Sequence, residues 1–237
     1  MRILVIIGGV VLLLAQAALV CVAAIAFYGA VPFGAEVNGE PVPIHQKVII
    51  IDPGHGGRDK GASGKHGVYE RDIVLSISQY IKEELETHGM RAVLTREGEA
   101  SLADPDADNQ KRDDMKKRVE IIKQERPDLV ISIHLNNFVR DPSVHGIQCF
   151  YDDDSDQSFI YADHIQKHLN KNLDNDRRAM RGDYFILETE FPGVLIECGF
   201  LSNPDEEAKL STTEYQKELA QLITQAVEEI LEKGSDF

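Results

Sequence analysis

The segment that most constrains the fold is Val48-Ile-Ile-Ile-Asp-Pro-Gly-His-Gly-Gly57, in which a run of branched apolar residues ends in a turn rich in proline and glycine. No polar residue interrupts the run at residues 48–51, so we expect a strand that is buried on both faces. Such strands are typical of α/β sheets covered by helices, where ligands bind just beyond the carboxyl ends of the strands. His55 therefore stands where an α/β enzyme places a functional group.

The remainder of the chain alternates between apolar runs and segments with helical spacing of apolar residues. Strands that alternate with helices predict a single α/β domain with a mainly parallel twisted sheet and helices on both faces. We expect Asp72 to cap the first helix and Gly89 to end it. Further strands are predicted at residues 91–95, 129–133, 146–151 and 193–196, and helices at residues 73–88, 113–125, 158–173 and 212–232.

The N-terminal segment has no charged residue from position 3 to position 35. A bilayer-spanning helix needs roughly 20 apolar residues, whereas a cleaved signal peptide has an apolar region of about 7–15. We therefore expect a transmembrane anchor over residues 1–28, a linker over residues 29–47 and a folded domain over residues 48–234. Arg2 favours a cytoplasmic N-terminus, which places the domain outside the cytoplasm. The Ala-Ala-Ile-Ala sequence at residues 23–26 keeps cleavage, and hence secretion, as the alternative.

The composition excludes two classes of partner. The chain has 25 Lys and Arg against 40 Asp and Glu, a formal net charge of −15. Nucleic-acid binders need a basic surface, so we expect no nucleic-acid partner, and tight adhesion to an anionic surface is also disfavoured.

The three cysteines, Cys21, Cys149 and Cys198, show no C-x-x-C spacing. Neither a thiolate zinc site nor a disulfide framework is therefore indicated.

Three of the predicted strands lead to side chains that can bind metal: one leads into His55, one ends at His134 and one ends at Glu197. In a parallel sheet these side chains gather at one edge. Imidazole and carboxylate ligands suit zinc, and a catalytic zinc keeps three protein ligands and one open position. The pattern leaves open which carboxylate would be a ligand and which a base. The alternative is that Glu197 is solvated where its strand reaches the surface.

Four motifs, in the same order along the chain, resemble those of the zinc-dependent N-acetylmuramoyl-L-alanine amidases: Asp52-Pro-Gly-His-Gly-Gly57, Tyr69-Glu-Arg-Asp72, Ser132-Ile-His-Leu-Asn136 and Ile196-Glu-Cys-Gly-Phe-Leu-Ser-Asn203. The resemblance covers about residues 47–233. It implies that His55, Glu70 and His134 hold Zn²⁺ and that Glu197 is the catalytic carboxylate. Glu70 is assigned by this resemblance alone, because an acid in the first turn of a helix is also favoured by the helix dipole.

The resemblance implies hydrolysis of the lactyl amide between muramic acid and L-alanine in bacterial peptidoglycan. A catalytic domain behind an N-terminal anchor is similar to the sporulation amidases, which remove stem peptides from spore-cortex muramic acid before δ-lactam formation and germination. The alternatives are a general cell-wall amidase, a zinc carboxypeptidase or deacetylase acting on the same polymer, and a non-catalytic wall-binding or regulatory protein on the same fold. An activating partner protein is compatible with the sequence but is not identified by it.

Several further positions match or depart from the family pattern. Arg96 and Arg118 resemble family positions and are interpreted as scaffold, as is Thr95. Asn136 either orients His134 or belongs to an ordinary turn. Glu188 stands where the family commonly has arginine, so the sequence does not predict how the stem peptide is recognised.

Overall fold

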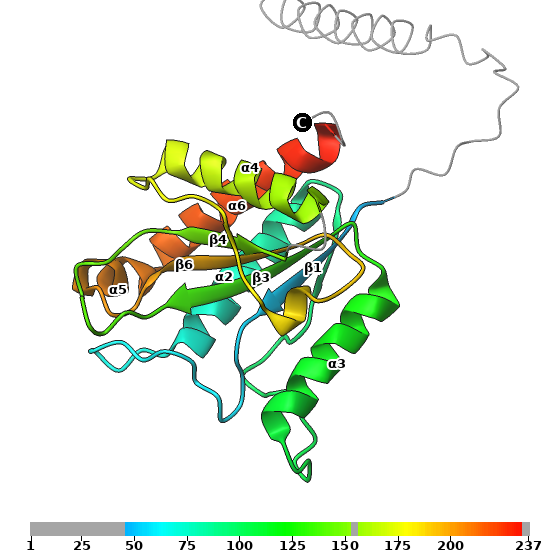
Figure 1. Cartoon of the computed structure of the whole chain (residues 1–237), viewed down its shortest axis with the longest axis horizontal. Helices are drawn as coiled ribbons and strands as arrows, with labels where there is room; N and C mark the ends of the chain where they lie inside the picture. Colours follow the sequence, from blue (N-terminus) through cyan, green and yellow to red (C-terminus); the bar gives the residue numbers. More distant parts are fainter. Residues whose placement is uncertain (1–45, 153–155, 234–237) are drawn as a thin grey trace, which may run out of the picture. The chain divides into compact units, whose positions relative to one another are not determined.

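Figure 1 shows a computed structural model of the chain, which describes residues 46–152 and 156–233. The expected anchor at residues 1–28 and nearly all of the expected linker at residues 29–47 lie outside the described residues. None of the helices that the structure describes combines the length and the apolar character needed for a membrane crossing.

The described part of the domain is built on a six-stranded sheet with the strand order β2-β1-β3-β6-β4-β5. Strands β2, β1, β3 and β6 are parallel, whereas β4 runs antiparallel to β6 and β5 runs parallel to β4. The sheet is therefore mixed rather than parallel throughout, because the chain passes from β3 to β4 without the crossover helix that a parallel return requires. The strands are β1 (Val48–Pro53), β2 (Arg91–Leu94), β3 (Leu129–Asn136), β4 (Gln148–Tyr151), β5 (Met180–Arg181) and β6 (Gly193–Phe200).

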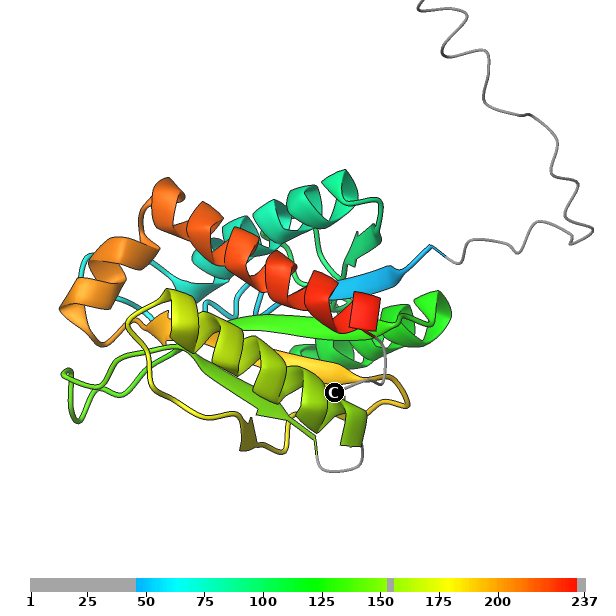
Figure 2. The ribbon, with the colours of Figure 1, turned by 90° about the horizontal axis from the view of Figure 1, so that it is seen from above.

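Helices cover both faces of the sheet, as predicted, but unequally. Figure 2 shows α6 lying between α2 and α4 across one face, while α3 and the short 3₁₀ helix η1 lie on the other. Side chains alternate along a strand, so Ile49 and Ile51 join the larger core and Ile50 joins the smaller core under α3 and η1. The helices are α2 (Glu70–Thr87), α3 (Gln110–Glu125), α4 (Asp156–Asn172), α5 (Pro204–Leu210), α6 (Thr213–Lys233) and η1 (Phe185–Leu187).

Three sequence-based boundaries were wrong in ways that affect the site. Helix α2 begins at Glu70, with Tyr69 at the N-cap position, so Asp72 lies in the first turn and does not cap the helix. The strands that were expected to end at His134 and Glu197 continue beyond both residues. They continue because β3 and β6 pair with each other through these positions, with His134 opposite Glu197, and this pairing satisfies the backbone groups.

Candidate metal centre

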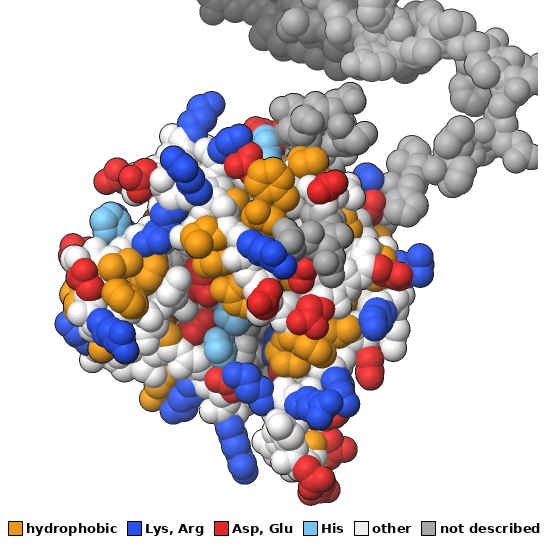
Figure 3. Space-filling model, in the orientation of Figure 1, with side chains coloured by type: hydrophobic (Ala, Val, Ile, Leu, Met, Phe, Trp, Pro, Cys, Tyr) orange, Lys and Arg blue, Asp and Glu red, His pale blue; other side chains and the backbone are white. Residues whose placement is uncertain are grey.

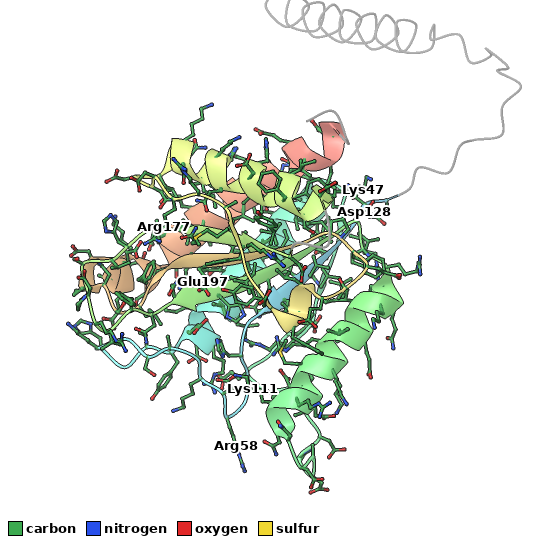
Figure 4. The ribbon with its side chains drawn as sticks, in the orientation of Figure 1. Lys47, Arg58, Lys111, Asp128, Arg177 and Glu197 are labelled. Atoms are coloured by element: carbon green, nitrogen blue, oxygen red, sulfur yellow. The ribbon has the colours of Figure 1, made fainter. Side chains whose placement is uncertain are left out.

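The pairing of β3 with β6 places His134 and Glu197 side by side on one face of the sheet. Because side chains alternate along each strand, this is the face of Val130 and Leu195, which belong to the smaller core under α3 and η1. Figure 4 marks Glu197 near the middle of the sheet. The thinner helical cover on this face leaves room for a site above the sheet.

His55 lies in the loop after β1 with a φ of 64°, in the left-handed region that residues other than glycine seldom occupy. Two buried arginines hold this loop by its carbonyl groups. Arg96 donates from Nε to Pro53 O at 3.0 Å and from Nη2 to Gly54 O at 2.8 Å. Arg118 donates from Nη1 to Pro53 O at 2.7 Å and from Nη2 to His55 O. Both arginines therefore fix the backbone that carries His55, in agreement with their interpretation as scaffold.

The Arg118 side chain is only 1% exposed and has two carboxylate partners. Its Nη1 lies 2.7 Å from Asp52 Oδ1, and its Nε lies 2.7 Å from Asp114 Oδ2. Thr95 and Ser132 also donate to Asp52, at 2.6 and 2.8 Å. Burial alone would raise the pKa of Asp52, but the charge of Arg118 and these hydrogen bonds lower it. The charged groups of Asp52 and Arg118 thus have hydrogen-bond partners, and this buried network supports the loop that carries His55.

Glu70, the first residue of α2, places one carboxylate oxygen between two imidazoles. Its Oε1 lies 3.0 Å from His55 Nε2 and 3.0 Å from His134 Nδ1. The carboxylate is also held by backbone amides, because Leu135 N donates to Oε1 at 2.9 Å and Ala62 N donates to Oε2 at 2.7 Å. Burial favours a raised pKa for Glu70, but the hydrogen bonds from His134 and His55 outweigh burial and hold the pKa well below its usual range.

Two glycines allow the three side chains to approach one another. A Cβ at Gly54 would lie 2.3 Å from His134 Cε1. A Cβ at Gly61 would lie 2.4 Å from Glu70 Oε2, and the φ of Gly61 is also positive, at 66°. Any larger residue at either position would therefore displace a side chain of the site.

His55, Glu70 and His134 form a group that can hold a metal ion. One ligand atom from each lies within 4.8 Å of the others, and no second group of this kind occurs among the residues that the structure describes. The donor set of two imidazole nitrogens and a carboxylate oxygen suits zinc, and three protein ligands leave the open position of a catalytic site. Asp59 Oδ2 lies 3.0 Å from His55 Nδ1, as expected for a carboxylate that orients a ligating imidazole.

Glu197 is in the opposite situation to Glu70. Its Oε2 atom is buried and has no hydrogen-bond partner among the residues that the structure describes. Burial raises the pKa of Glu197 to about 7, and the negative charge of Glu70 acts in the same direction, while His134 and His55 act against it. A carboxylate that gains and loses a proton near neutral pH is suited to general acid–base catalysis.

A pocket of about 400 Å³ opens beside His55 and His134, and its apolar wall includes Tyr184, Phe185 and Ile186. The space-filling view shows a hollow near the middle of the molecule in which histidine and acidic side chains are visible (Figure 3). Sequence reasoning did not predict this wall. A 3₁₀ helix of three residues is too short to leave a periodic pattern of apolar residues, so no sequence signal was available for it.

Glu207 on α5 is another residue that the sequence did not single out. It accepts a hydrogen bond from His66 N at 2.8 Å, and its Oε2 lies 3.1 Å from His66 Nδ1. Residues 62–69 lead directly into Glu70, so Glu207 anchors the segment that delivers this side chain to the site. The two partners are 141 residues apart, and no local pattern could have connected them.

The structure also places two residues about which the sequence left questions. Asn136 is the last residue of β3 and does not lie in a turn, and its carboxamide oxygen accepts a hydrogen bond from Asn137 N at 2.8 Å. Glu188 is exposed at the C-cap of η1. Neither residue is among those that line the pocket beside His55 and His134.

Comparison with known proteins identifies the family of the chain. Residues 49–229 match the sequence profile of the N-acetylmuramoyl-L-alanine amidase family. The germination-specific N-acetylmuramoyl-L-alanine amidase of Bacillus subtilis is 36% identical over 192 residues, which cover 78% of this chain and 80% of that protein. The N-acetylmuramoyl-L-alanine amidase AmiA of Escherichia coli is 26% identical, with 77% of this chain and 75% of that protein covered.

Solved structures give the same relationship. The structure of the CwlD amidase of Clostridioides difficile, determined in complex with the GerS lipoprotein, matches this chain with a TM-score of 0.77 and 35% sequence identity. The match covers 80% of this chain and 100% of the CwlD chain. The catalytic domain of CwlV from Bacillus (Paenibacillus) polymyxa matches with a TM-score of 0.70 and 29% sequence identity. This match covers 79% of this chain and 99% of the CwlV chain. The chain belongs to the N-acetylmuramoyl-L-alanine amidase family and is an enzyme of that class.

Proposed function

We propose that this amidase is zinc-dependent and hydrolyses the amide between the lactyl carbonyl of muramic acid and L-alanine of the stem peptide. The observation that carries the proposal is the position of Glu70 Oε1, which lies 3.0 Å from a nitrogen of His55 and 3.0 Å from a nitrogen of His134. The same site contains Glu197, whose buried Oε2 has no hydrogen-bond partner among the described residues. Bound zinc supplies a Lewis acid that polarises the carbonyl and lowers the pKa of water from about 15.7 to about 7.

The residues of the site divide the remaining work. His55, Glu70 and His134 hold the metal, and Asp59 orients His55. Glu197 takes a proton from the attacking water and delivers it to the alanine nitrogen as the carbon–nitrogen bond breaks. The products are a muramyl residue with a free carboxyl group and a stem peptide with a free amino group, so atoms and protons balance without a further reactant.

The proposed substrate is the peptidoglycan of the spore cortex. Support comes from the germination-specific relative and from the CwlD amidase, both of which cover most of the folded domain. The carboxyl group freed by cleavage is the group that a muramic δ-lactam requires, so the reaction would precede lactam formation. Deleting the gene in a spore-forming host is expected to remove δ-lactam from cortex muropeptides. Unchanged δ-lactam content would favour a general cell-wall role.

The location and a partner are also proposals. An anchor at residues 1–28 would hold the catalytic domain outside the cytoplasm, and protease digestion of intact cells should then degrade the domain while sparing a cytoplasmic control protein. Protection of the domain from protease would contradict this location.

The CwlD amidase was solved in complex with the GerS lipoprotein, which supports the proposal that this chain also binds a lipoprotein. Co-purification of such a lipoprotein from sporulating cells, lost when its gene is deleted, would test it.

Digestion of purified peptidoglycan, followed by mass spectrometry of the products, tests the activity itself. The proposed reaction yields free muramyl carboxyl groups and released stem peptides, and a zinc chelator abolishes both. A carboxypeptidase would leave shortened peptides attached to muramic acid, and a deacetylase would free amino groups on the glycan. Binding to the polymer without any product would instead indicate a wall-binding or regulatory protein.

A further inference from the structure

Two cationic side chains lie at the pocket beside the metal-binding residues. Arg58 is in the loop after β1, three positions beyond His55, and Lys111 is in the first turn of α3. Both are exposed, and both line the pocket of about 400 Å³ that also contacts His55 and His134. Figure 4 labels Arg58, on the loop after β1, and Lys111, at the start of α3, in the region below Glu197.

Neither side chain makes a hydrogen bond or a salt bridge within the described part of the chain, although the charge of Lys111 acts on the Asp59 carboxylate, which lines the same pocket. The acids that line the same pocket are engaged elsewhere. Asp114 lies 2.7 Å from Arg118, and Asp59 lies 3.0 Å from His55 Nδ1. In a chain with a net charge of −15, two cations without a hydrogen-bonded carboxylate at the mouth of one pocket are available to bind an anionic group.

Two exposed cations at a pocket next to the cleaved bond indicate which part of the substrate enters it. In the intact substrate, the lactyl carboxyl group of muramic acid is consumed by the amide that will be cut. Free carboxylates therefore belong to the peptide, which has at least one at its C-terminus. The apolar wall formed by Met115, Phe185 and Ile186 fits the aliphatic parts of a peptide, while a guanidinium and an ammonium at the rim fit a carboxylate.

We infer that Arg58 and Lys111 form a subsite that binds a free carboxylate of the stem peptide, so that the peptide lies in this pocket and the glycan lies on the other side of His55, Glu70 and His134. The inference rests on the proposed amidase function and names the residues that recognise its substrate. Arg58 and Lys111 are assigned to substrate specificity and take no part in the chemistry.

The test compares two synthetic muramoyl peptides that differ only in whether the peptide carboxyl groups are free or converted into carboxamides. The zinc-loaded full chain should cleave the acid with a kcat/KM higher by roughly three- to tenfold, the size expected for two solvent-exposed charge pairs. In the double variant Arg58→Gln/Lys111→Gln the ratio should fall to about one, through a higher KM for the acid. Added salt should reduce the ratio in the unmodified enzyme.

The matched control is Arg112→Gln/Lys116→Gln, which removes two exposed cations from α3 that do not line the pocket. The control should keep the preference for the acid. Equal cleavage of both substrates by the unmodified enzyme, or an unchanged ratio in the Arg58/Lys111 variant, would overturn the subsite and leave the amidase function standing. An equal loss on both substrates, or the same loss in the control, would also overturn it. Failure of the unmodified enzyme to cleave either peptide would instead reject the proposed function.

Discussion

Glu70 and Glu197 belong to one site and have opposite surroundings. Glu70, at the start of α2, accepts hydrogen bonds from two backbone amides and lies 3.0 Å from a nitrogen of each of two histidines. Its pKa is held well below the usual range. Glu197, in the middle of β6, has a buried oxygen without a hydrogen-bond partner among the described residues, and burial raises its pKa to about 7.

The difference shows how one site assigns two roles to the same amino acid. A carboxylate whose hydrogen bonds are already made stays charged and fixed, as a metal ligand must. A carboxylate that is desolvated and unpaired changes its protonation state easily, as a general base must. Titratable groups whose environments separate their pKa values in this way mark the division of labour in many active sites. The predictions below test this division.

The largest effect is expected from Glu197→Gln, which keeps the shape of the side chain and removes the base. We predict a fall in kcat of roughly a thousandfold, within the range that general acid–base catalysis contributes. Because Glu197 is assigned no bond to the metal, the zinc content measured by atomic emission should equal that of the unmodified enzyme. Activity within tenfold of normal would remove Glu197 from the reaction, and a loss of zinc would make it a ligand.

Glu70→Gln should have the opposite signature, with metal binding as the property that is lost. A neutral amide cannot supply the charge of the ligand, and changes in residues behind metal ligands already cost about 10–100-fold. We predict a loss of zinc affinity of roughly a hundredfold or more, measured by competition with a chromophoric chelator. Glu83→Gln, at an exposed position of the same helix, is the control and should bind zinc normally.

The comparison also predicts how the stability of the metal-free protein depends on pH. The folded-state pKa of Glu197 is raised from 4.5 to about 7, so the folded state binds this proton more tightly and loses stability as pH rises through that interval. Glu70 behaves in the opposite way, because its lowered pKa gives stability that is lost only as pH falls below about 4.5. Its contribution is therefore constant between pH 5 and pH 8.

As the pH rises from 5 to 8, the free energy of unfolding of the unmodified protein should therefore fall relative to that of Glu197→Gln. The change in the difference should be on the order of 2 kcal/mol. Urea unfolding of both proteins at the two pH values, in the presence of a chelator, measures this difference. A difference that does not change with pH, or that changes in the opposite direction, would show that the Glu197 carboxylate is not held at a raised pKa.

The smallest effect is expected from Glu207→Gln, which weakens the anchor of residues 62–69. Glu207 acts on Glu70 only through that segment, so zinc affinity should fall by no more than about tenfold. The chelator competition used for Glu70→Gln measures this change. A loss as large as that of Glu70→Gln would mean that the loop, and not the backbone amide of Leu135, holds Glu70 in place.

Much of the site could be predicted from the sequence, because His134 and Glu197 lie on buried strands and His55 follows one. The uninterrupted apolar runs located the strands that carry His134 and Glu197 and the strand that leads to His55. Glu70 had no such signal, since an acid in the first turn of a helix is common for reasons unrelated to metal binding. Only the similarity of its motif to the amidase family assigned it a role.

The remaining features depend on contacts between distant parts of the chain. The continuation of β3 and β6 past His134 and Glu197 follows from their pairing with each other, which no single segment encodes. The antiparallel direction of β4 depends on a connection without a helix, and η1 is too short to show periodicity. The carbonyl contacts of Arg96 and Arg118 likewise join residues 42–65 positions apart.

The division between Glu70 and Glu197 is tested most directly by a crystal structure of the zinc-loaded enzyme, with anomalous diffraction at the zinc edge. We predict one zinc bonded to His55, Glu70 and His134, with each bond at about 2.0–2.2 Å. The carboxylate of Glu197 should lie outside the coordination sphere, within hydrogen-bond reach of a water molecule at the open position. A zinc ion coordinated by Glu197 in place of Glu70 would contradict the account.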